Sequence, residues 1–439
     1  MSDVEYVRLE LTLETPFLPG SADPNVVDSD WPLRPSEVKG IWRWWARALV
    51  AGALFDRGLL HGQGNRDAVK VTTRIEANCV SRVVGRGLGL GYAGSDGSMS
   101  SCFRIRLERM NFNAPRNVDY GLTNRLQRVR LLTLGKRPAQ LQYVDRGSAT
   151  MVIESHTACS LDNASIEAAL YALALALRLS CFGKGGRRGL GCFSVRAYGR
   201  YSGIFNRGYG EPREPGGLIE SALNTVGKVV DSMVTKECRG LEGKGIGDCE
   251  LPPMPIVSTN KDYTNCIDAK YREGVKGLGR LTPYKLIMIQ GGQRRDLLDV
   301  LHNFFLRPTR TRAIHGSYGV QDSLRQELKA WILGLPREQR GTGYEIMGSA
   351  SRRASPMLLA VHSNEAYLSV FTSADWPNKL KWYSFKPKQS LTEEKDKGLK
   401  IEIIEKDVID ATAIALSEFM KYLEENKKQG IIQGVSVWP

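Results

Sequence analysis

The chain has 439 residues, of which 42% are hydrophobic and 25% are charged. These fractions are typical of a folded globular protein and exclude wholesale disorder. A chain of this length is too long for one ordinary core, so we expect two or three domains. Its 61 Lys and Arg exceed its 47 Asp and Glu, which gives a net charge of +14. A polyanion is therefore the first partner to consider.

The positive charge is concentrated in the first half of the chain. Residues 1–210 contain 28 Lys and Arg against 18 Asp and Glu, and 24 of these 28 cations are Arg. Arginine is planar and multidentate, so it grips phosphates and stacks on bases better than lysine does. Enrichment of arginine for thermal stability is the alternative interpretation.

The eight cysteines do not indicate a secreted disulfide scaffold, because they are few for this length and form no CxxC pair. Cys181 and Cys192 are separated by ten residues, as are Cys238 and Cys249, and no histidine stands at ligand spacing from either pair. Structural zinc sites usually show ligands roughly two to four residues apart. We therefore expect no metal and no cofactor.

Nothing in the sequence predicts a membrane segment. The opening MSDVEYVRLE lacks the basic and apolar regions of a signal peptide. The most apolar stretch, 164–182, contains Glu167 and Arg178, which indicates a buried helix and not a membrane span. We expect a cytoplasmic protein that does not enter a membrane.

The first half opens with a strand in which apolar and polar residues alternate. Two helices follow, one preceded by Pro35 and one capped by Asp162 or Asn163. The predicted elements are a strand at 6–13, a helix at about 36–55, a strand at 103–107, a helix at about 163–179 and a strand at 193–198. Their order fits a ferredoxin-like unit with long insertions.

The second half repeats this plan more loosely. Its predicted elements are a strand at 283–289, a helix at 323–333, a basic glycine-bearing loop at 334–356, a strand at 357–361, a helix at about 408–423 and a strand at 431–437. We predict an α+β protein of two tandem ferredoxin-like (RRM-like) domains with long insertions. Their expected bounds are 1–210 and 211–439.

The helix that begins near Ser36 carries a basic stripe. Lys39, Arg43 and Arg47 recur every four residues, beside an apolar face that places Trp42 and Trp45 in the core. Ser36 and the free N–H groups of the first turn add an anion-accepting end, so we predict that they and the stripe bind an RNA phosphate backbone. The alternative interpretation is an ordinary amphipathic helix whose basic stripe faces solvent and binds no RNA.

Trp44 lies off the apolar face of the same helix. An aromatic ring in that position can stack on an RNA base, so we predict base stacking for Trp44.

A glycine-rich loop follows the apolar helix, with the sequence GKGGRRGLG from Gly183 to Gly191. Such glycines let a backbone approach a ligand and present N–H groups as an anion nest. The loop is not a Walker P-loop, because no Ser or Thr follows its lysine and it runs from helix to strand. The residues that we assign to RNA binding here are Gly183, Lys184, Gly185, Gly186, Arg187, Arg188 and Gly189.

Two further basic groups stand in the second half. Arg352 and Arg353 precede a predicted strand, while Arg307, Arg310 and Arg312 cluster upstream. Either group extends the basic track for RNA or binds an acidic partner subunit, and the sequence alone leaves both interpretations open.

Catalytic signals are weak. The five histidines are scattered, and no GxSxG or HExxH motif occurs. Asp23 is the one carboxylate in a turn-rich loop that we consider for a role on an RNA backbone. An Asx turn is the more ordinary role for such an aspartate.

Several motifs resemble a known family. They are Thr15-Pro16-Phe17, then Ala22-Asp23-Pro24, then LRPSEVKG at 33–40 and RWWARAL at 43–49. This run resembles the opening of the first subunits of the Cmr complex, which are RAMP-superfamily proteins of type III-B CRISPR interference. The glycine-rich loop resembles that of the superfamily. The segment Leu333–Pro336, with Arg353 and Ser355-Pro356, looks like the C-terminal signature of these subunits.

The resemblance implies tandem ferredoxin-like folds in an antiviral ribonucleoprotein. It implies binding of the 3′ part of the guide RNA (crRNA), of the end of the guide–target duplex, or of both. The implied partners are single-stranded guide and target RNA and other Cmr subunits. In this family target cleavage belongs to the backbone subunit, so we predict a non-catalytic RNA-binding subunit. The alternatives are a RAMP-type endoribonuclease using Asp23 and an assembly adaptor with little RNA affinity of its own.

Overall fold

The structure is a computed structural model of the chain and combines helices with antiparallel sheets, which confirms the α+β class. It describes residues 4–20, 23, 25–133, 141–156, 159–206, 214–305, 323–335, 337–339, 342–349, 352–384 and 399–439.

The first large sheet has the strand order β4-β7-β1-β8, with every neighbouring pair antiparallel. Its strands are β1 (Glu5–Leu13), β4 (Phe103–Phe112), β7 (Gly147–Ser155) and β8 (Phe193–Tyr198). The strands predicted from alternation are confirmed, because β1 and β8 each bury every second residue. The centre of β7 instead buries four residues in a row, so it has no alternation to recognise.

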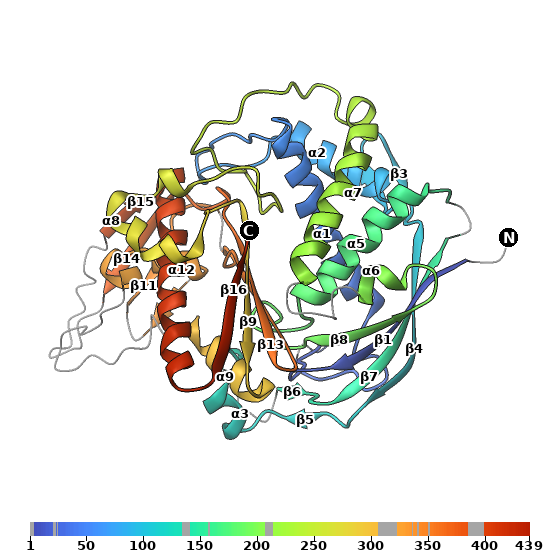
Figure 1. Cartoon of the computed structure of the whole chain (residues 1–439), viewed down its shortest axis with the longest axis horizontal. Coiled ribbons are helices and arrows are strands. Elements are labelled where there is room, and N and C mark those ends of the chain that lie inside the picture. The colour runs from blue at the N-terminus through green and yellow to red at the C-terminus, as the bar shows by residue number, and fades with distance from the viewer. Residues whose placement is uncertain are drawn as a thin grey trace.

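Two long helices cover one face of this sheet, and a third packs on them (Figure 1). They are α1 (Pro35–Asp56), α5 (Asn163–Leu179) and α7 (Glu214–Glu237), which pack against one another. The first two confirm predicted helices, and the Asp162 carboxylate caps α5 by accepting the Ser165 N–H at 2.7 Å. Trp42 and Trp45 are fully buried, as predicted.

The second large sheet has the strand order β12-β13-β9-β16, again antiparallel throughout. Its strands are β9 (Tyr284–Gly291), β12 (Met357–His362), β13 (Glu365–Phe371) and β16 (Ile432–Trp438). Helix α9 (Arg294–Phe304) follows the first of these strands, and α12 (Glu405–Lys428) follows the third. Numbered along the chain, both large sheets therefore run second, third, first, fourth.

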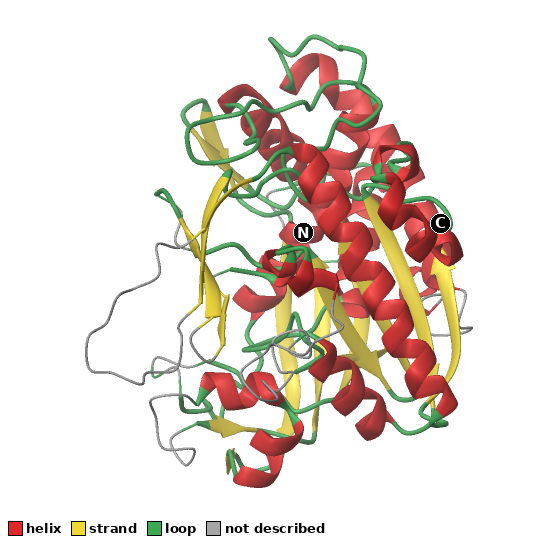
Figure 2. Ribbon diagram, turned by 90° about the vertical axis from the view of Figure 1, so that its left-hand side faces the viewer, coloured by secondary structure: helices red, strands yellow, loops and turns green. Residues whose placement is uncertain are grey.

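Strands β12, β13 and β9 of the second sheet are buried on both faces. From β9, Tyr284 and Leu286 point into the core of the first half, while Ile287 and Ile289 point into a second core beside α9 and α12. Figure 2 shows the resulting layers of red helices and yellow strands. Leu190 of the glycine-rich loop also belongs to the second core, so the two halves share their packing.

Smaller elements surround these sheets. A third sheet contains β10 (Arg337–Gln339), β11 (Thr342–Ile346), β14 (Lys379–Ser384) and β15 (Leu399–Glu402). Two short hairpin-like pairs are β2 (Tyr92–Gly94) with β3 (Gly97–Met99) and β5 (Arg116–Asn117) with β6 (Gln142–Tyr143). The short helices are α2 (Arg74–Arg82), η1 (Val83–Gly87), α3 (Tyr120–Arg125), α4 (Gln127–Leu132), α6 (Ser202–Asn206), η4 (Thr264–Cys266), α8 (Ala269–Arg272), η5 (Glu273–Leu278), α11 (Ser323–Gln326) and η6 (Ala330–Leu333).

The helix predicted at 323–333 is wrong. The segment forms two separate turns, α11 and η6, instead of one helix. Leu328 between them has a φ of 50°, a left-handed conformation that interrupts right-handed helical bonding.

The cysteines also require a correction. All eight are paired in disulfides, which the spacing of the cysteines did not predict. The pairs are Cys79–Cys238, Cys102–Cys159, Cys181–Cys192 and Cys249–Cys266. Partners up to 159 residues apart in the chain meet only through folding, so spacing alone does not reveal them.

The disulfides predict a measurable dependence of stability on redox state. Unreduced protein unfolded in denaturant should show no free thiol when titrated with a thiol reagent. Replacing both Cys79 and Cys238 by Ser should lower the free energy of unfolding by about 2–4 kcal/mol, because the link constrains a long loop of the unfolded chain. Free thiols in the unreduced chain, or identical unfolding curves with and without reductant, would contradict the pairing.

Candidate nucleic-acid interface

A groove of about 670 Å³ lies where the glycine-rich loop meets the second half of the chain. Five arginines line it, and no Asp or Glu is among the lining residues that the structure describes. We call it the arginine groove after Arg128, Arg187, Arg188, Arg352 and Arg353. The structure thus brings together the two basic segments, more than 160 residues apart, that the sequence analysis singled out separately.

The backbone of the glycine-rich loop is fixed by the protein itself. The N–H of Gly183 donates to the Glu37 carboxylate at 2.5 Å, and that of Lys184 donates to the carbonyl oxygen of Leu18 at 2.9 Å. The N–H groups of Gly186 and Arg188 donate to carbonyls within the loop. The predicted anion nest is therefore wrong for these four amides, because protein acceptors already use them.

Glycine is required at several positions of the loop because its backbone packs closely against other backbone atoms. Gly189 has a φ of 79°, in the left-handed region that favours glycine. A Cβ at Gly186 would lie 2.4 Å from the carbonyl oxygen of Cys181, which is inside any real contact distance. Cys181 and Cys192 close the loop with a disulfide at its base. The loop is a rigid platform for its arginine side chains.

Arg187 and Arg188 reach from this platform into the second half. Arg187 Nη1 donates to the carbonyl oxygen of Ser355 at 3.0 Å. Arg188 donates to the carbonyl oxygens of Met357 at 2.9 Å and Leu333 at 3.2 Å. Its guanidinium also lies 3.8 Å from the centroid of the Phe305 ring, a cation–π contact. These carbonyls orient the guanidinium groups without neutralising their charge.

The cations of the groove repel one another. Burial, and then the neighbouring Arg353, lower the pKa of Arg187 to about 10. Partial desolvation, and then Arg352, lower the pKa of Arg128 in the same direction. Arg353 is the best compensated of the five, because Asp375 lies 2.8 Å from its guanidinium. A bound anion would relieve this repulsion.

A buried histidine that the sequence analysis did not select supports the groove. His302 Nε2 accepts the backbone N–H of Arg128 at 2.9 Å, so its Nδ1 carries the proton that it donates to the carbonyl oxygen of Arg188, also at 2.9 Å. Burial lowers the pKa of His302 to about 4, with Arg188 and Arg128 as further causes in that direction. Neutral His302 therefore joins α4 to the glycine-rich loop. A lone histidine in the sequence carries no signal of such a role.

The basic stripe of α1 lies outside the groove lining. Arg43 is turned to the backbone, where its Nε donates to the carbonyl oxygen of Leu90 at 2.8 Å. Arg47 and Ser36 are exposed, and Lys39 is half-buried, with burial and Arg43 lowering its pKa. RNA contact by the stripe stays a prediction.

Trp44 lies close to the groove from the side of α1. Its ring packs edge-on against Trp45 and Phe371, with centroid distances of 5.4 and 5.2 Å. The guanidinium of Arg187 lies 5.9 Å from the Trp44 ring centroid. Trp44 is half-buried, and base stacking stays a prediction.

The remaining sequence candidates lie elsewhere. Asp23 is exposed and accepts the N–H of Asn25 at 2.8 Å, which is an Asx turn. Arg307, Arg310 and Arg312 lie outside the described residues. Within the described part of the chain, no group of three or more His, Cys, Asp or Glu is arranged to hold a metal ion. No helix of that part has the length and apolar character to cross a membrane.

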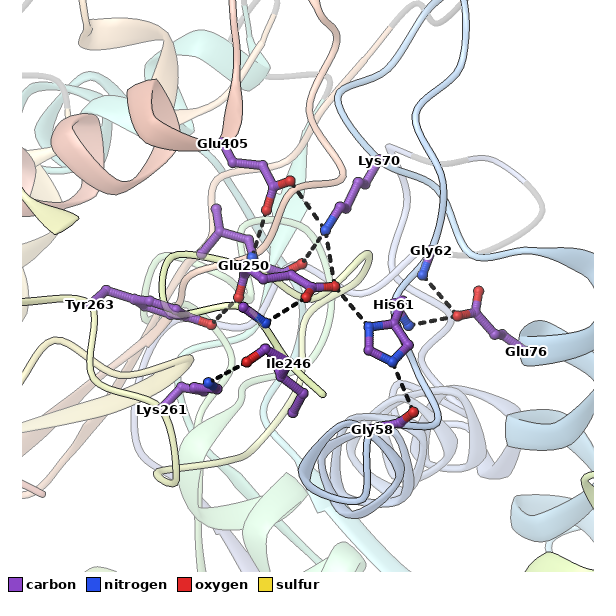
Figure 3. Close-up of polar contacts among 12 residues, drawn as sticks. Gly58, His61, Gly62, Lys70, Glu76, Ile246, Glu250, Lys261, Tyr263 and Glu405 are labelled. Atoms are coloured by element: carbon purple, nitrogen blue, oxygen red, sulfur yellow. Dashed lines mark hydrogen bonds and ion pairs between the residues drawn. The ribbon is translucent and has the colours of Figure 1, made fainter. Parts of the chain in front are cut away.

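A second polar cluster lies outside the groove and joins three segments of the chain (Figure 3). His61 Nδ1 lies 2.8 Å from Glu250, and Lys70 Nζ lies 3.4 Å from Glu250 and 3.1 Å from Glu405. Glu76 accepts the backbone N–H of His61 at 2.6 Å. The cluster ties the segment after α1 to the start of α12, which is a structural role.

One family model matches part of the chain. Residues 10–194, which run from β1 through the glycine-rich loop into β8, match the family model of the RAMP superfamily. The match confirms the resemblance predicted from the motifs. No curated protein matches by sequence.

A chain solved within a Cmr complex has a similar fold. A chain of type III-B Cmr-beta, bound to cognate target RNA and AMPPnP in the presence of ssDNA, is 12% identical, with 95% of this chain and 100% of that chain covered and a TM-score of 0.51. Cmr1 from Pyrococcus furiosus in its apo form is 15% identical, with 98% of each chain covered and a TM-score of 0.48. At these identities the likeness concerns the fold alone.

The neutral state of His302 predicts a pH dependence of stability. Its folded pKa of about 4 lies below the ordinary 6.5, so the unfolded chain binds more protons between these values. Stability should therefore be lost as the pH falls from about 6.5 toward 4. In His302→Gln the slope of unfolding free energy against pH should be shallower across this range, measured by urea unfolding.

Some slope should remain in His302→Gln, because burial also lowers the pKa of His362, to about 3. A slope identical to that of the unchanged protein would show that His302 is not held neutral by the fold.

Proposed function

We propose that the protein is a non-catalytic RNA-binding subunit of a type III-B Cmr effector complex, acting in the cytoplasm. Single-stranded RNA, from the guide or the target, would lie in the arginine groove, with other Cmr subunits as further partners. One observation carries the proposal: two basic segments far apart in the sequence form one groove with five arginines and no acidic residue among its described lining. The superfamily match and the Cmr-like fold support it.

The chemistry of the groove favours a phosphate polymer. Arg187 and Arg188 are oriented by neutral backbone carbonyls. Arg352 is exposed and adds a third cation. No acidic residue is among the described lining of the groove. Phe305 and Leu335 give the groove an apolar component, which suits unpaired bases as well as phosphates. Single-stranded RNA offers both.

The strand order supports tandem ferredoxin-like units. Each large sheet runs second, third, first, fourth along the chain, with a helix after its first and third strands. This is the β-α-β-β-α-β plan of that fold. We propose that the units correspond to 1–210 and 211–439, with α7 of the second unit lying on the helices of the first.

The endoribonuclease alternative receives no support from the position of Asp23. Its carboxylate caps its own turn and is not part of the groove lining. We expect Asp23→Ala to leave any RNA processing by the assembled complex unchanged, when the products are resolved on a denaturing gel.

Salt dependence tests the groove directly. The affinity for single-stranded RNA, measured by fluorescence anisotropy, should fall linearly on a log–log plot against salt concentration. Arg352→Ala should weaken binding and reduce the magnitude of that slope by roughly 0.7, the contribution of one phosphate contact on a single strand. The matched control is Arg104→Ala on β4, an exposed arginine outside the groove lining, which should change neither quantity.

Equal effects of the two substitutions would mean that binding follows overall charge and not the groove. No RNA binding by the unchanged chain, together with capture of other Cmr subunits, would favour the adaptor role instead.

A further inference from the structure

A smaller pocket of about 240 Å³ adjoins the arginine groove on the side of α1. We call it the Trp44 pocket; its walls include Gly40, Ile41, Trp44, Gly186, Arg187 and Leu358. We infer that this pocket takes a single unstacked nucleobase from RNA that lies in the arginine groove. The inference rests on the proposed function and adds to it a recognition site for a base.

The pocket and the groove adjoin, because Gly186 and Arg187 line both of them. A nucleotide whose phosphate meets the cations of the groove has its base within reach of the pocket. The pocket also joins both halves of the chain, because Leu358 belongs to β12 and Trp44 to α1.

The size and surfaces of the pocket fit one ring system. Its volume lies below the range of about 300–1,000 Å³ that is usual for sites of drug-sized ligands. Ile41 and Leu358 make its walls apolar, and Trp44 supplies an aromatic face. Unpaired bases in RNA–protein complexes are held by stacking on aromatic rings and on arginine guanidinium planes. Trp44 and Arg187 are the corresponding groups here, with the guanidinium 5.9 Å from the ring centroid.

Trp44 is oriented before a ligand arrives. Trp45 and Phe371 hold its ring edge-on from two other directions. Trp45 is itself fixed, since its Nε1–H donates to Ser180 Oγ at 2.8 Å. A ring held in this way loses little freedom on stacking, which favours binding of a base. The cations of the adjoining groove favour a nucleotide over an apolar side chain of a partner protein, because only the nucleotide carries a phosphate that they can bind.

Gly40 allows the pocket to be filled without disturbing the fold. A Cβ placed at this position meets no atom within 4 Å, so a larger side chain has room to enter the pocket from α1. Replacing a helical glycine by leucine also favours the helix. Gly40→Leu should therefore block the pocket in a protein that folds normally, while Gly40→Ala is the matched control that leaves the pocket open.

The experiment compares two probes on each variant, an oligouridylate and a ribose–phosphate oligomer of the same length that carries no bases. The unchanged protein should bind the oligouridylate more tightly, and Gly40→Leu should remove on the order of tenfold of that preference. Affinity for the oligomer without bases should stay the same in Gly40→Leu. Gly40→Ala should behave as the unchanged protein does. Trp44→Ala should reproduce the loss, and Trp44→Phe should retain most of the preference.

Three outcomes would overturn the inference. If Gly40→Leu leaves the preference for the oligouridylate unchanged, the pocket holds no base. If it weakens both oligomers equally, the substitution has disturbed the groove, and a preference retained in Trp44→Ala would then exclude the pocket. If the unchanged protein binds neither oligomer, the proposed RNA-binding function itself fails, and the pocket with it.

Discussion

Two neighbouring arginines of the glycine-rich loop connect the halves of this protein. Arg187 and Arg188 leave the first half and donate to backbone carbonyls around the start of β12 in the second. The carbonyl of Arg187 also accepts the N–H of Leu359, so side chains and backbone take part in the same junction. This junction places the loop beside Arg352 and Arg353, which line the arginine groove with it.

The junction also explains the electrostatic character of the groove. Carbonyl oxygens accept hydrogen bonds from the guanidinium groups of Arg187 and Arg188 but carry no full charge. His302 is neutral and adds no further positive charge while it holds Arg128 and Arg188 in place. The disulfide between Cys181 and Cys192 limits the movement of the loop that carries them. The result is a rigid, positively charged surface, which suits a ligand with repeated negative charges.

Local patterns made much of the fold predictable from the sequence. Strand β1 alternates, and α5 has a capping aspartate and a continuous apolar run, so each carries its own signal. Strand β13 was not predicted, and it shows no alternation because both of its faces are buried. The glycine-rich loop and Arg353 were recognised as separate basic segments, but their union depends on tertiary packing. Arg43 was predicted to face RNA as part of a regular basic stripe on α1. Its hydrogen bond to the carbonyl oxygen of Leu90 depends on tertiary packing and could not be read from the spacing.

Photo-cross-linking of the full chain tests most directly whether both halves contribute to one RNA-binding groove. Single-stranded RNA containing 4-thiouridine would be irradiated in complex with the protein, and the cross-linked peptides would be identified by mass spectrometry. We expect cross-links in the glycine-rich loop at 183–191 and in the segment 352–355 from the same RNA. Cross-links confined to one half, or to the exposed face of α1 around Arg47, would contradict a shared groove.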